Sequence, residues 1–400
     1  MLERAKLRYQ ALKKLSTKYI KQFPKRFVLY IALRSRYEKL SLNNDKFVIS
    51  SELPPFPSKA FDRAIKALKS TTNGDIIPFY ASFSITNKCV YDCWHCYINS
   101  LKEEDMSTEM ALKIIGELQD LGVSVIALTG GEPLLRKDLT KIISEIDDRS
   151  STVLFTTGHG LTKEKAIELK NAGLFIIIVG LEHSSPEIHD KLRGHKGAYD
   201  TALKAIKNAK EAGLYVGVAT AATKERIKKG EIWDFIELAG KKGIDEVLIL
   251  EPIPVGKLFE KEDSLLTKEE RKQLIELQKN TNKTERYSRV ISCPYRQSKN
   301  MAGCSAGYEY IHVSASGNIC PCSFTPFSFG NAKKEDVKTI WKRMNDTFNK
   351  PHSHCFMLQN YRLIPKNRDD GFIHYEQAVQ IYNNCPANKP PKLYKRLGVK

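Results

Sequence analysis

The chain has 400 residues, of which 42% are hydrophobic and 28% charged, and its formal net charge is +18. This composition predicts one large globular domain with smaller additions, and it excludes intrinsic disorder, a collagen repeat and a disulfide-rich miniprotein. The longest apolar run, residues 174–181, is too short to span a bilayer, and the first 25 residues carry lysines instead of a signal-peptide apolar stretch. We therefore expect a cytoplasmic protein whose nine cysteines serve metal binding or catalysis rather than disulfides.

The positive charge is concentrated at the two ends of the chain. Residues 1–42 carry twelve lysines and arginines against two acids, and residues 385–400 carry five more with no acid. The 342 residues between these ends have a net charge of only +3. Whatever partner the basic charge recognises is therefore expected to contact the ends.

Residues 1–75 are predicted to form a separate, basic helical extension. Apolar side chains recur at three- and four-residue spacing, with lysines and arginines on the remaining faces, at Leu2, Ala5, Tyr9, Leu12, Leu15 and Tyr19. Pro24 interrupts this helix, and residues 27–33 form a short apolar run that is predicted to begin a second helix. Three prolines within residues 54–57 indicate a linker to the next unit.

From residue 79 onward, β-type and helical segments alternate along the chain. The predicted strands are residues 79–85, 123–128, 152–156, 174–180, 215–220 and 246–250. The predicted helices are residues 107–121, 139–146, 163–172, 199–212 and 231–242. This alternation predicts an α/β fold with a parallel sheet covered by helices, either a β/α barrel or a doubly wound sheet. In a barrel, the chemistry belongs to the loops that follow the C-terminal ends of the strands.

Three cysteines follow the first predicted strand, in Cys89-Val90-Tyr91-Asp92-Cys93-Trp94-His95-Cys96. Three thiolates at this spacing can hold three irons of a four-iron four-sulfur (4Fe-4S) cluster and leave the fourth iron open to another ligand. The alternatives are a zinc site, with His95 or a distant residue as fourth ligand, and cysteines that are simply buried. Structural zinc usually takes its thiols in CxxC pairs, so the triplet favours iron and sulfur.

A second motif, Gly130-Gly131-Glu132-Pro133, follows the second predicted strand. With both motifs at strand ends, residues 79–256 resemble the radical S-adenosylmethionine (SAM) enzymes, whose hallmarks are CxxxCxxC and GGEP. The resemblance implies a partial (β/α)6 TIM-type barrel over residues 76–284, and a cofactor-binding turn at Gly130, Gly131, Glu132 and Pro133 that approaches the methionine ammonium of SAM. It also implies that an electron, from a donor such as flavodoxin or ferredoxin, cleaves SAM to a 5′-deoxyadenosyl radical that takes a hydrogen atom from substrate.

Further loops match this family less tightly. Glu182 stands where family members place a polar residue near the SAM ribose, with an ordinary loop carboxylate as the alternative. Arg193 resembles the arginine that pairs with the SAM carboxylate. His159 departs from the usual Thr-Asn-Gly loop, and it is either a substrate contact, an acid-base group or a solvated histidine. Residues 252–256 resemble the segment that lies along the adenine.

The C-terminal cysteines form a second constellation, in which Cys304, Gly317 and Cys322 resemble the opening of the SPASM and twitch extensions. The resemblance implies that residues 285–400 form a small, cysteine-rich α+β domain with one auxiliary 4Fe-4S cluster. The predicted ligands are Cys293, Cys304, Cys322 and Cys355. Cys320 or Cys385 is the alternative for one of them, and zinc binding or a partly structural role is the alternative for the set.

The basic ends suggest the substrate. A basic amphipathic helix suits an anionic membrane surface, although a solvated helix packed against the barrel would have a similar sequence. The first hypothesis is therefore an enzyme at the inner membrane face that abstracts hydrogen from an anionic or membrane-associated substrate, with a lipid or polyol headgroup favoured. The closest rival is a maturase of a ribosomally synthesised peptide. A zinc-stabilised, non-catalytic nucleic-acid-binding protein is a third hypothesis, disfavoured because no RRM, KH or zinc-finger pattern accompanies the basic ends.

Overall fold

A nine-stranded sheet forms the centre of the computed structural model, which describes residues 2–98, 101, 104–366, 368, 370–386 and 389–399. The strand order is β11-β10-β3-β4-β5-β6-β7-β8-β9, parallel throughout except that β11 is antiparallel to β10. The strands are β3 (Tyr80–Thr86), β4 (Val125–Gly130), β5 (Ser151–Thr156), β6 (Ile176–Gly180), β7 (Tyr215–Ala221), β8 (Glu246–Leu250), β9 (Arg289–Ser292), β10 (Tyr310–Val313) and β11 (Ile319–Cys320). Because this order is linear, β11 and β9 are the two edges of the sheet among the described strands, and the predicted α/β class with a partial barrel is confirmed.

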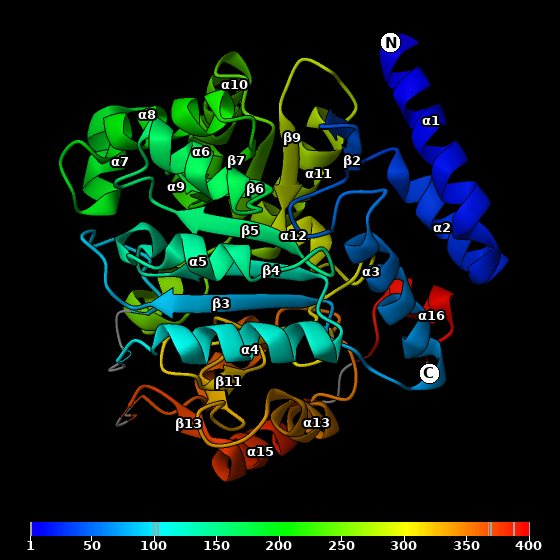
Figure 1. Cartoon of the computed structure of the whole chain (residues 1–400), viewed down its shortest axis with the longest axis vertical. Helices are drawn as coiled ribbons and strands as arrows, with labels where there is room; N and C mark the ends of the chain where they lie inside the picture. The colour runs from blue at the N-terminus through cyan, green and yellow to red at the C-terminus, as the bar shows by residue number, and fades with distance from the viewer. Residues whose placement is uncertain are drawn as a thin grey trace.

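Helices follow the strands and bury a continuous apolar core against the sheet (Figure 1). They are α4 (Thr108–Leu121), α5 (Leu139–Ser144), α6 (Lys163–Asn171), α7 (Pro186–Arg193), α8 (Ala198–Glu211), α9 (Lys224–Lys229), α10 (Glu231–Lys241) and α11 (Lys268–Thr281). Several begin at a Ser or Thr whose side chain accepts a backbone hydrogen bond, namely Ser107, Thr162, Ser185, Thr223 and Thr267. The helices α7, α9 and α11 lie outside the predicted set. In α7 and α9, eight and six residues give too little periodicity to recognise.

The C-terminal part continues the sheet and adds a smaller, mixed layer. Beyond β9 to β11, its elements are β12 (Phe327–Ser328), β13 (Ile373–His374), α12 (Cys293–Arg296), α13 (Val337–Thr347), α14 (Phe356–Asn360), α15 (Tyr375–Asn383) and α16 (Lys392–Leu397). The rings of Phe329, Phe348 and Phe356 pack edge to face in its interior. Since β10 pairs with β3, the C-terminal part is built onto the first strand of the barrel.

The N-terminal part closes the end of the sheet at which the strands begin. It contains α1 (Leu2–Lys18), α2 (Lys25–Ser35), β1 (Ser41–Asn43), β2 (Lys46–Val48) and α3 (Lys59–Ser70). Arg289, the first residue of β9, donates from Nε to the carbonyl of Lys39 (2.7 Å) and from Nη2 to that of Val48 (2.7 Å). Glu246, the first residue of β8, accepts a hydrogen bond from the backbone N–H of Ser51 (3.1 Å). The predicted proline linker is packed, since Phe56 is only 1% exposed.

The apolar face of α1 differs from the predicted one. Ala11 and Tyr19 are buried, and Leu7 and Leu15 pack beside them, but Tyr9 is 68% and Leu12 51% exposed. The buried residues recur at intervals of four, so one stripe of the helix packs and its neighbour stays on the surface.

None of the helices in the described ranges is both long enough and apolar enough to cross a bilayer. In the described part of the chain, short 3-10 turns are η1 (Ile20–Gln22), η2 (Thr71–Asn73), η3 (Pro133–Leu135), η4 (Gly256–Leu258), η5 (Glu262–Ser264) and η6 (Tyr361–Leu363).

Candidate active site

The loop that carries the three motif cysteines is tied to the end of α7. The backbone N–H of Asp92 donates to the carbonyl of Arg193 (3.1 Å), and that of Trp94 donates to the carbonyl of Leu192 (3.0 Å). Gly194 ends the helix with φ of 61°, and a Cβ there would lie 2.6 Å from the carbonyl oxygen of Asp92. The sequence predicted Arg193 and the cysteines as separate features, and in the structure these two backbone hydrogen bonds join the cysteine loop to the helix end that carries Arg193.

The GGEP turn holds the loops after β3 and β4 in contact. The backbone N–H of Gly131 donates to the carbonyl of Thr86 (2.8 Å), and that of Glu132 donates to the carbonyl of Lys88 (2.8 Å). A Cβ on Gly130 would lie 2.1 Å from the Thr86 oxygen, and one on Gly131 would lie 2.2 Å from the Lys88 oxygen. Both glycines are therefore needed for the turn to approach the backbone that leads into Cys89.

Glu132 is fully buried and its carboxylate is saturated. Its Oε1 accepts from the Thr156 hydroxyl (2.6 Å) and the Leu134 N–H (2.9 Å), and its Oε2 accepts from the N–H (2.7 Å) and hydroxyl (2.5 Å) of Thr157. Burial raises the pKa of Glu132, and these hydrogen bonds oppose that rise. A carboxylate offers about four acceptor positions, and these four hydrogen bonds occupy them. Glu132 therefore holds the loops after β4 and β5 together. Its contact with a methionine ammonium stays a prediction.

Glu182 and Arg193 form a buried ion pair beside the cysteine loop. Arg193 Nη2 lies 2.9 Å from Glu182 Oε1, and Arg193 Nη1 lies 3.5 Å from Cys93 Sγ. Burial alone would raise the pKa of Glu182, but the Arg193 guanidinium and His95 outweigh it and hold that pKa below its ordinary value. A Cβ on Gly180 would lie 2.1 Å from Arg193 Nη2, so the glycine at the end of β6 makes room for the guanidinium.

A cavity at this edge of the sheet has the donors that the two cofactors require. It is lined by His95, Gly131, Thr157, Gly180, Glu182 and Arg193, among others. Three buried side-chain nitrogens have no hydrogen-bond partner among the described residues: His95 Nδ1 and Arg193 Nε belong to residues that line the cavity, and Trp94 Nε1 belongs to the neighbouring cysteine loop. Such donors mark a place for a ligand. Three thiols, a guanidinium and unpartnered N–H groups therefore fit an iron-sulfur cluster together with a ligand that carries a carboxylate.

His159 lies beside the same loop. The ring of Tyr91, within the cysteine motif, stacks on His195 at 4.5 Å between centroids and meets His159 edge-on at 6.1 Å. His159 and His195 are themselves 6.2 Å apart. His159 is thus part of an aromatic cluster at the rim of the site, and its role in substrate contact stays a prediction.

The four predicted auxiliary ligands influence one another in pairs, and their joint role as ligands stays a prediction. A hydrogen bond between the Cys304 and Cys355 thiols lowers the pKa of Cys304 and raises that of Cys355. Burial raises the pKa of Cys322 and Cys293 to about 12. The charge of Cys304 also raises the pKa of Cys322, and that of Cys322 raises the pKa of Cys293. The thiol of the alternative ligand Cys385 donates to the carbonyl of Ile381 (3.3 Å).

Within the described ranges of the chain, no three His, Cys, Asp or Glu side chains converge on one ion, and this holds for the cysteines of both constellations. The finding therefore weighs equally on zinc and on an iron-sulfur cluster, and the choice between them rests on the family.

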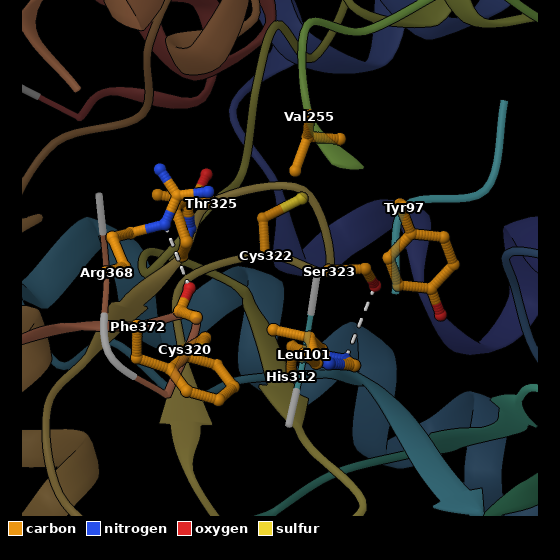
Figure 2. A pocket seen from close by; sticks show the side chains of 12 residues that line it. Tyr97, Leu101, Val255, His312, Cys320, Cys322, Ser323, Thr325, Arg368 and Phe372 are labelled. Carbon is orange, nitrogen blue, oxygen red and sulfur yellow. Dashed lines mark hydrogen bonds between the residues drawn. The ribbon is translucent and has the colours of Figure 1, made fainter. Parts of the chain in front are cut away.

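A second cavity separates the barrel from the C-terminal part (Figure 2). Tyr97, directly after the third motif cysteine, and Val255 line one side, and Cys322, Thr325 and Arg368 line the other. The other alternative ligand, Cys320, also lines this cavity.

Sequence reasoning did not find His312, which lies at the base of the second cavity. Its Nδ1 is 2.6 Å from the Ser82 hydroxyl, and burial lowers the pKa of His312 to about 4, so the ring is neutral at pH 7. Its position within the apolar strand β10 gives no signal in the sequence.

Comparison with known proteins decides the family. A sequence model of the radical SAM superfamily matches residues 83–239, and one of the SPASM iron-sulfur cluster-binding domain matches residues 304–365. The chain is 30% identical over 256 residues to the probable GTP 3′,8-cyclase of Saccharolobus islandicus strain M.14.25, a match that covers 60% of this chain and 81% of that one. The chain belongs to the radical SAM superfamily. It is an enzyme, and the two matched domains imply a 4Fe-4S cluster with SAM and an auxiliary cluster, as the sequence predicted.

Other members of this superfamily differ in their chemistry. The chain is 23% identical over 288 residues to the AdoMet-dependent heme synthase of Oleidesulfovibrio alaskensis, covering 66% of this chain and 74% of that one. It is 26% identical over 278 residues to the subtilosin biosynthesis protein AlbA of Bacillus subtilis, covering 68% and 61%. Its fold resembles that of Streptococcus suis SuiB bound to the precursor peptide SuiA, with a TM-score of 0.59 and 16% identity over 78% of this chain and 79% of that one.

Proposed function

We propose that the protein is a radical SAM maturase that abstracts a hydrogen atom from a ribosomally synthesised peptide. One observation favours this substrate over a lipid or polyol headgroup: the basic ends lie at the opposite end of the sheet from the motif loops. Lys39, in the N-terminal basic end, contacts Arg289 where β9 begins, and Tyr394, in the C-terminal basic end, contacts Glu309 directly before β10. The cysteine loop instead follows the last residue of β3. The charge on which the lipid hypothesis rests is therefore remote from the mouth of the site.

Two relatives support a peptide substrate. AlbA takes part in the biosynthesis of subtilosin, a bacteriocin, and SuiB was solved with a precursor peptide. The heme synthase and the cyclase act on other substrates by their names, so the family alone leaves the substrate open. We choose a peptide over a lipid substrate because the basic ends are remote from the motif loops.

In this proposal, Cys89, Cys93 and Cys96 hold the cluster that binds SAM. Cluster and SAM together supply a 5′-deoxyadenosyl radical, which removes a hydrogen atom from substrate. Arg193 lies between Cys93 and Glu182, so its guanidinium can pair with the SAM carboxylate without leaving its own ion pair. Gly130 and Gly131 set the distance between the two motif loops, and Glu132 keeps the β5 loop against them.

Cys293, Cys304, Cys322 and Cys355 hold the auxiliary cluster in this proposal. The cavity of Figure 2 then lies between the two cluster sites, with Tyr97 on the radical side and Cys322 on the auxiliary side. Arg368 offers a cation at the edge of this cavity.

The redox partner and the domain limits are part of the same proposal. The reductant is a flavodoxin or ferredoxin, because radical SAM chemistry consumes one electron for each SAM cleaved. We place the domain limits at residues 1–75, 76–284 and 285–400, with β9 and β10 extending the central sheet into the last domain.

The test uses the anaerobically reconstituted holoenzyme with SAM and dithionite, and it measures 5′-deoxyadenosine. Three extracts of the source cell are added in separate arms: peptides below 10 kDa, total lipids, and small polar metabolites. We expect the peptide arm alone to stimulate 5′-deoxyadenosine formation, and digestion of that extract with proteinase K to abolish the effect. Stimulation by the lipid arm, or by a peptide arm that resists digestion, would overturn the proposal.

A further inference from the structure

The two basic ends of the chain meet in space. Helix α16 packs against α2 (Figure 1). Arg26 Nε in α2 donates to the carbonyl of Arg396 in α16 (3.1 Å), and the Tyr30 hydroxyl in α2 donates to the carbonyl of Asn300, before α16. The described helices of the two ends therefore lie side by side, and the sequence of these ends, residues 1–42 and 385–400, carries +15 of the net charge of +18. We call the solvent-facing side of α1, α2 and α16 the basic end surface.

The basic end surface also exposes large apolar side chains. Of the fourteen large hydrophobic residues that are exposed in the described ranges, seven lie within residues 9–42, about a tenth of the chain. Five of the seven are on α1 and α2, whereas Ile20 lies in η1 and Leu42 in β1. On α2, Leu29 is 62% and Leu33 56% exposed, and Lys25 precedes Leu29 by one turn. On α1, Tyr9 and Leu12 are exposed beside Lys13. Leucines interleaved with lysines are the pattern of a helix that lies at a membrane interface.

The basic end surface faces away from the catalytic rim. Its helices adjoin the segment that contacts the first residues of β8 and β9, and Tyr394 of α16 donates a hydrogen bond to Glu309, directly before β10 begins. The cysteine and GGEP loops follow the opposite ends of the parallel strands. Strands of five to seven residues separate the two faces by roughly 20 Å. Figure 1 shows α1, α2 and α16 at the side of the sheet away from the arrowheads.

We propose that the basic end surface binds an anionic lipid bilayer and holds the enzyme there with its catalytic rim turned toward the aqueous phase. The positive charge complements anionic headgroups, and the exposed leucines enter the headgroup boundary. A single-stranded nucleic acid would instead call for aromatic stacking platforms, and Tyr9 is the one large aromatic among the seven exposed residues. The substrate then reaches the rim from solution, so bilayer binding and the proposed peptide chemistry are independent of each other.

The first test is flotation of the full-length protein with vesicles of phosphatidylglycerol and phosphatidylcholine, without SAM. We expect binding to vesicles with anionic lipid, loss of binding in 0.5 M salt, and none to pure phosphatidylcholine. Because each basic residue near an anionic surface strengthens binding about fivefold, the triple variant Lys392→Gln/Lys395→Gln/Arg396→Gln should bind roughly a hundredfold more weakly. Its matched control removes three exposed lysines of the α13 region, in Lys334→Gln/Lys338→Gln/Lys342→Gln, and should bind as the unmodified protein does.

The outcomes distinguish an anionic bilayer from a nucleic acid as the ligand of the basic end surface. Failure of the unmodified protein to float with anionic vesicles, or equal weakening in the control triple variant, would overturn the proposal. Unchanged binding in the C-terminal triple variant would also overturn it, because the two ends would then not act as one surface. If Leu29→Gln/Leu33→Gln leaves vesicle binding intact and RNA competes with vesicles for the unmodified protein, the surface is a polyanion site and the bilayer assignment is wrong.

The second test concerns orientation. A tryptophan introduced by Leu29→Trp should gain fluorescence that brominated lipids quench. One introduced by Leu135→Trp, at the end of η3 on the catalytic rim, should be unaffected by them. Quenching at position 135 with none at position 29 would show that the rim faces the bilayer and would refute the proposed orientation.

Discussion

The buried pair of Glu182 and Arg193 is the sharpest place to perturb the site. Glu182→Gln removes one charge and leaves the Arg193 guanidinium buried, with side chains that are 2% and 9% exposed. Removing one partner of a buried ion pair costs about 3–5 kcal/mol, and since glutamine can still accept from the Ala221 N–H, we expect about 3 kcal/mol. The measurement is urea unfolding of the apoprotein, followed by far-ultraviolet circular dichroism.

Two further variants separate charge from shape. The control Glu225→Gln breaks the exposed pair with Lys229, whose side chains are 72% and 57% exposed, and should change the free energy of unfolding by less than about 0.5 kcal/mol. The double variant Glu182→Gln/Arg193→Met removes both charges and should recover most of the lost stability. It should not recover SAM binding, because Arg193 is the proposed carboxylate partner.

The pH dependence follows from the depressed pKa of Glu182. A carboxylate whose folded pKa lies below its unfolded value adds stability above the unfolded pKa, about 4.3, and loses it as the pH falls through the folded pKa. The stability gap between the unmodified protein and Glu182→Gln should therefore be full at pH 7 and shrink below about pH 4. A single variant within 1 kcal/mol of the unmodified protein, or a double variant no more stable than the single one, would refute the reasoning.

Other predictions address single features. Burial raises the pKa of Glu309 to about 7. Because the unfolded pKa is about 4.3, the folded protein loses stability through this group as the pH rises from about 4 to 7. The variant Glu309→Gln should therefore raise the free energy of unfolding by up to about 3 kcal/mol at pH 8 and leave it unchanged at pH 4. Gly131→Ala should lower 5′-deoxyadenosine formation at least tenfold, since its Cβ would meet the Lys88 carbonyl at 2.2 Å, whereas Gly116→Ala, with open space around it, should be active. Cys322→Ser should lose about four irons and Cys320→Ser none, as measured by iron and sulfide analysis of the reconstituted protein.

The sequence predicted the barrel strands because each is a short, mainly apolar segment, rich in β-branched and aromatic residues, that alternates with a helical segment. The strand at residues 246–250 has the predicted bounds, and the others differ by one or two residues at their ends. The outlying strands β9 and β10 were not predicted, because four residues each, next to cysteines and serines, carry no period. Their place in the sheet is set by pairing with β8 and β3, which are distant in sequence.

The candidate site was predictable in its composition and not in its contacts. Cysteine spacing and the GGEP turn identified the cofactor chemistry. The pairing of Glu182 with Arg193, and the four hydrogen bonds that saturate Glu132, depend on how loops from different strands meet. Tyr9 and Leu12 show the same limit, since the helical period cannot say which of two adjacent apolar stripes will find a partner.

The central claim is that one chain holds two iron-sulfur clusters, one of which cleaves SAM. The measurement is iron, sulfide and 5′-deoxyadenosine on anaerobically reconstituted protein with SAM and dithionite, beside the Cys89→Ala/Cys93→Ala/Cys96→Ala variant. We predict about eight irons in the unmodified protein and about four in the variant, with 5′-deoxyadenosine formation lost. Zinc in place of iron, or 5′-deoxyadenosine formation that survives the triple substitution, would contradict the account.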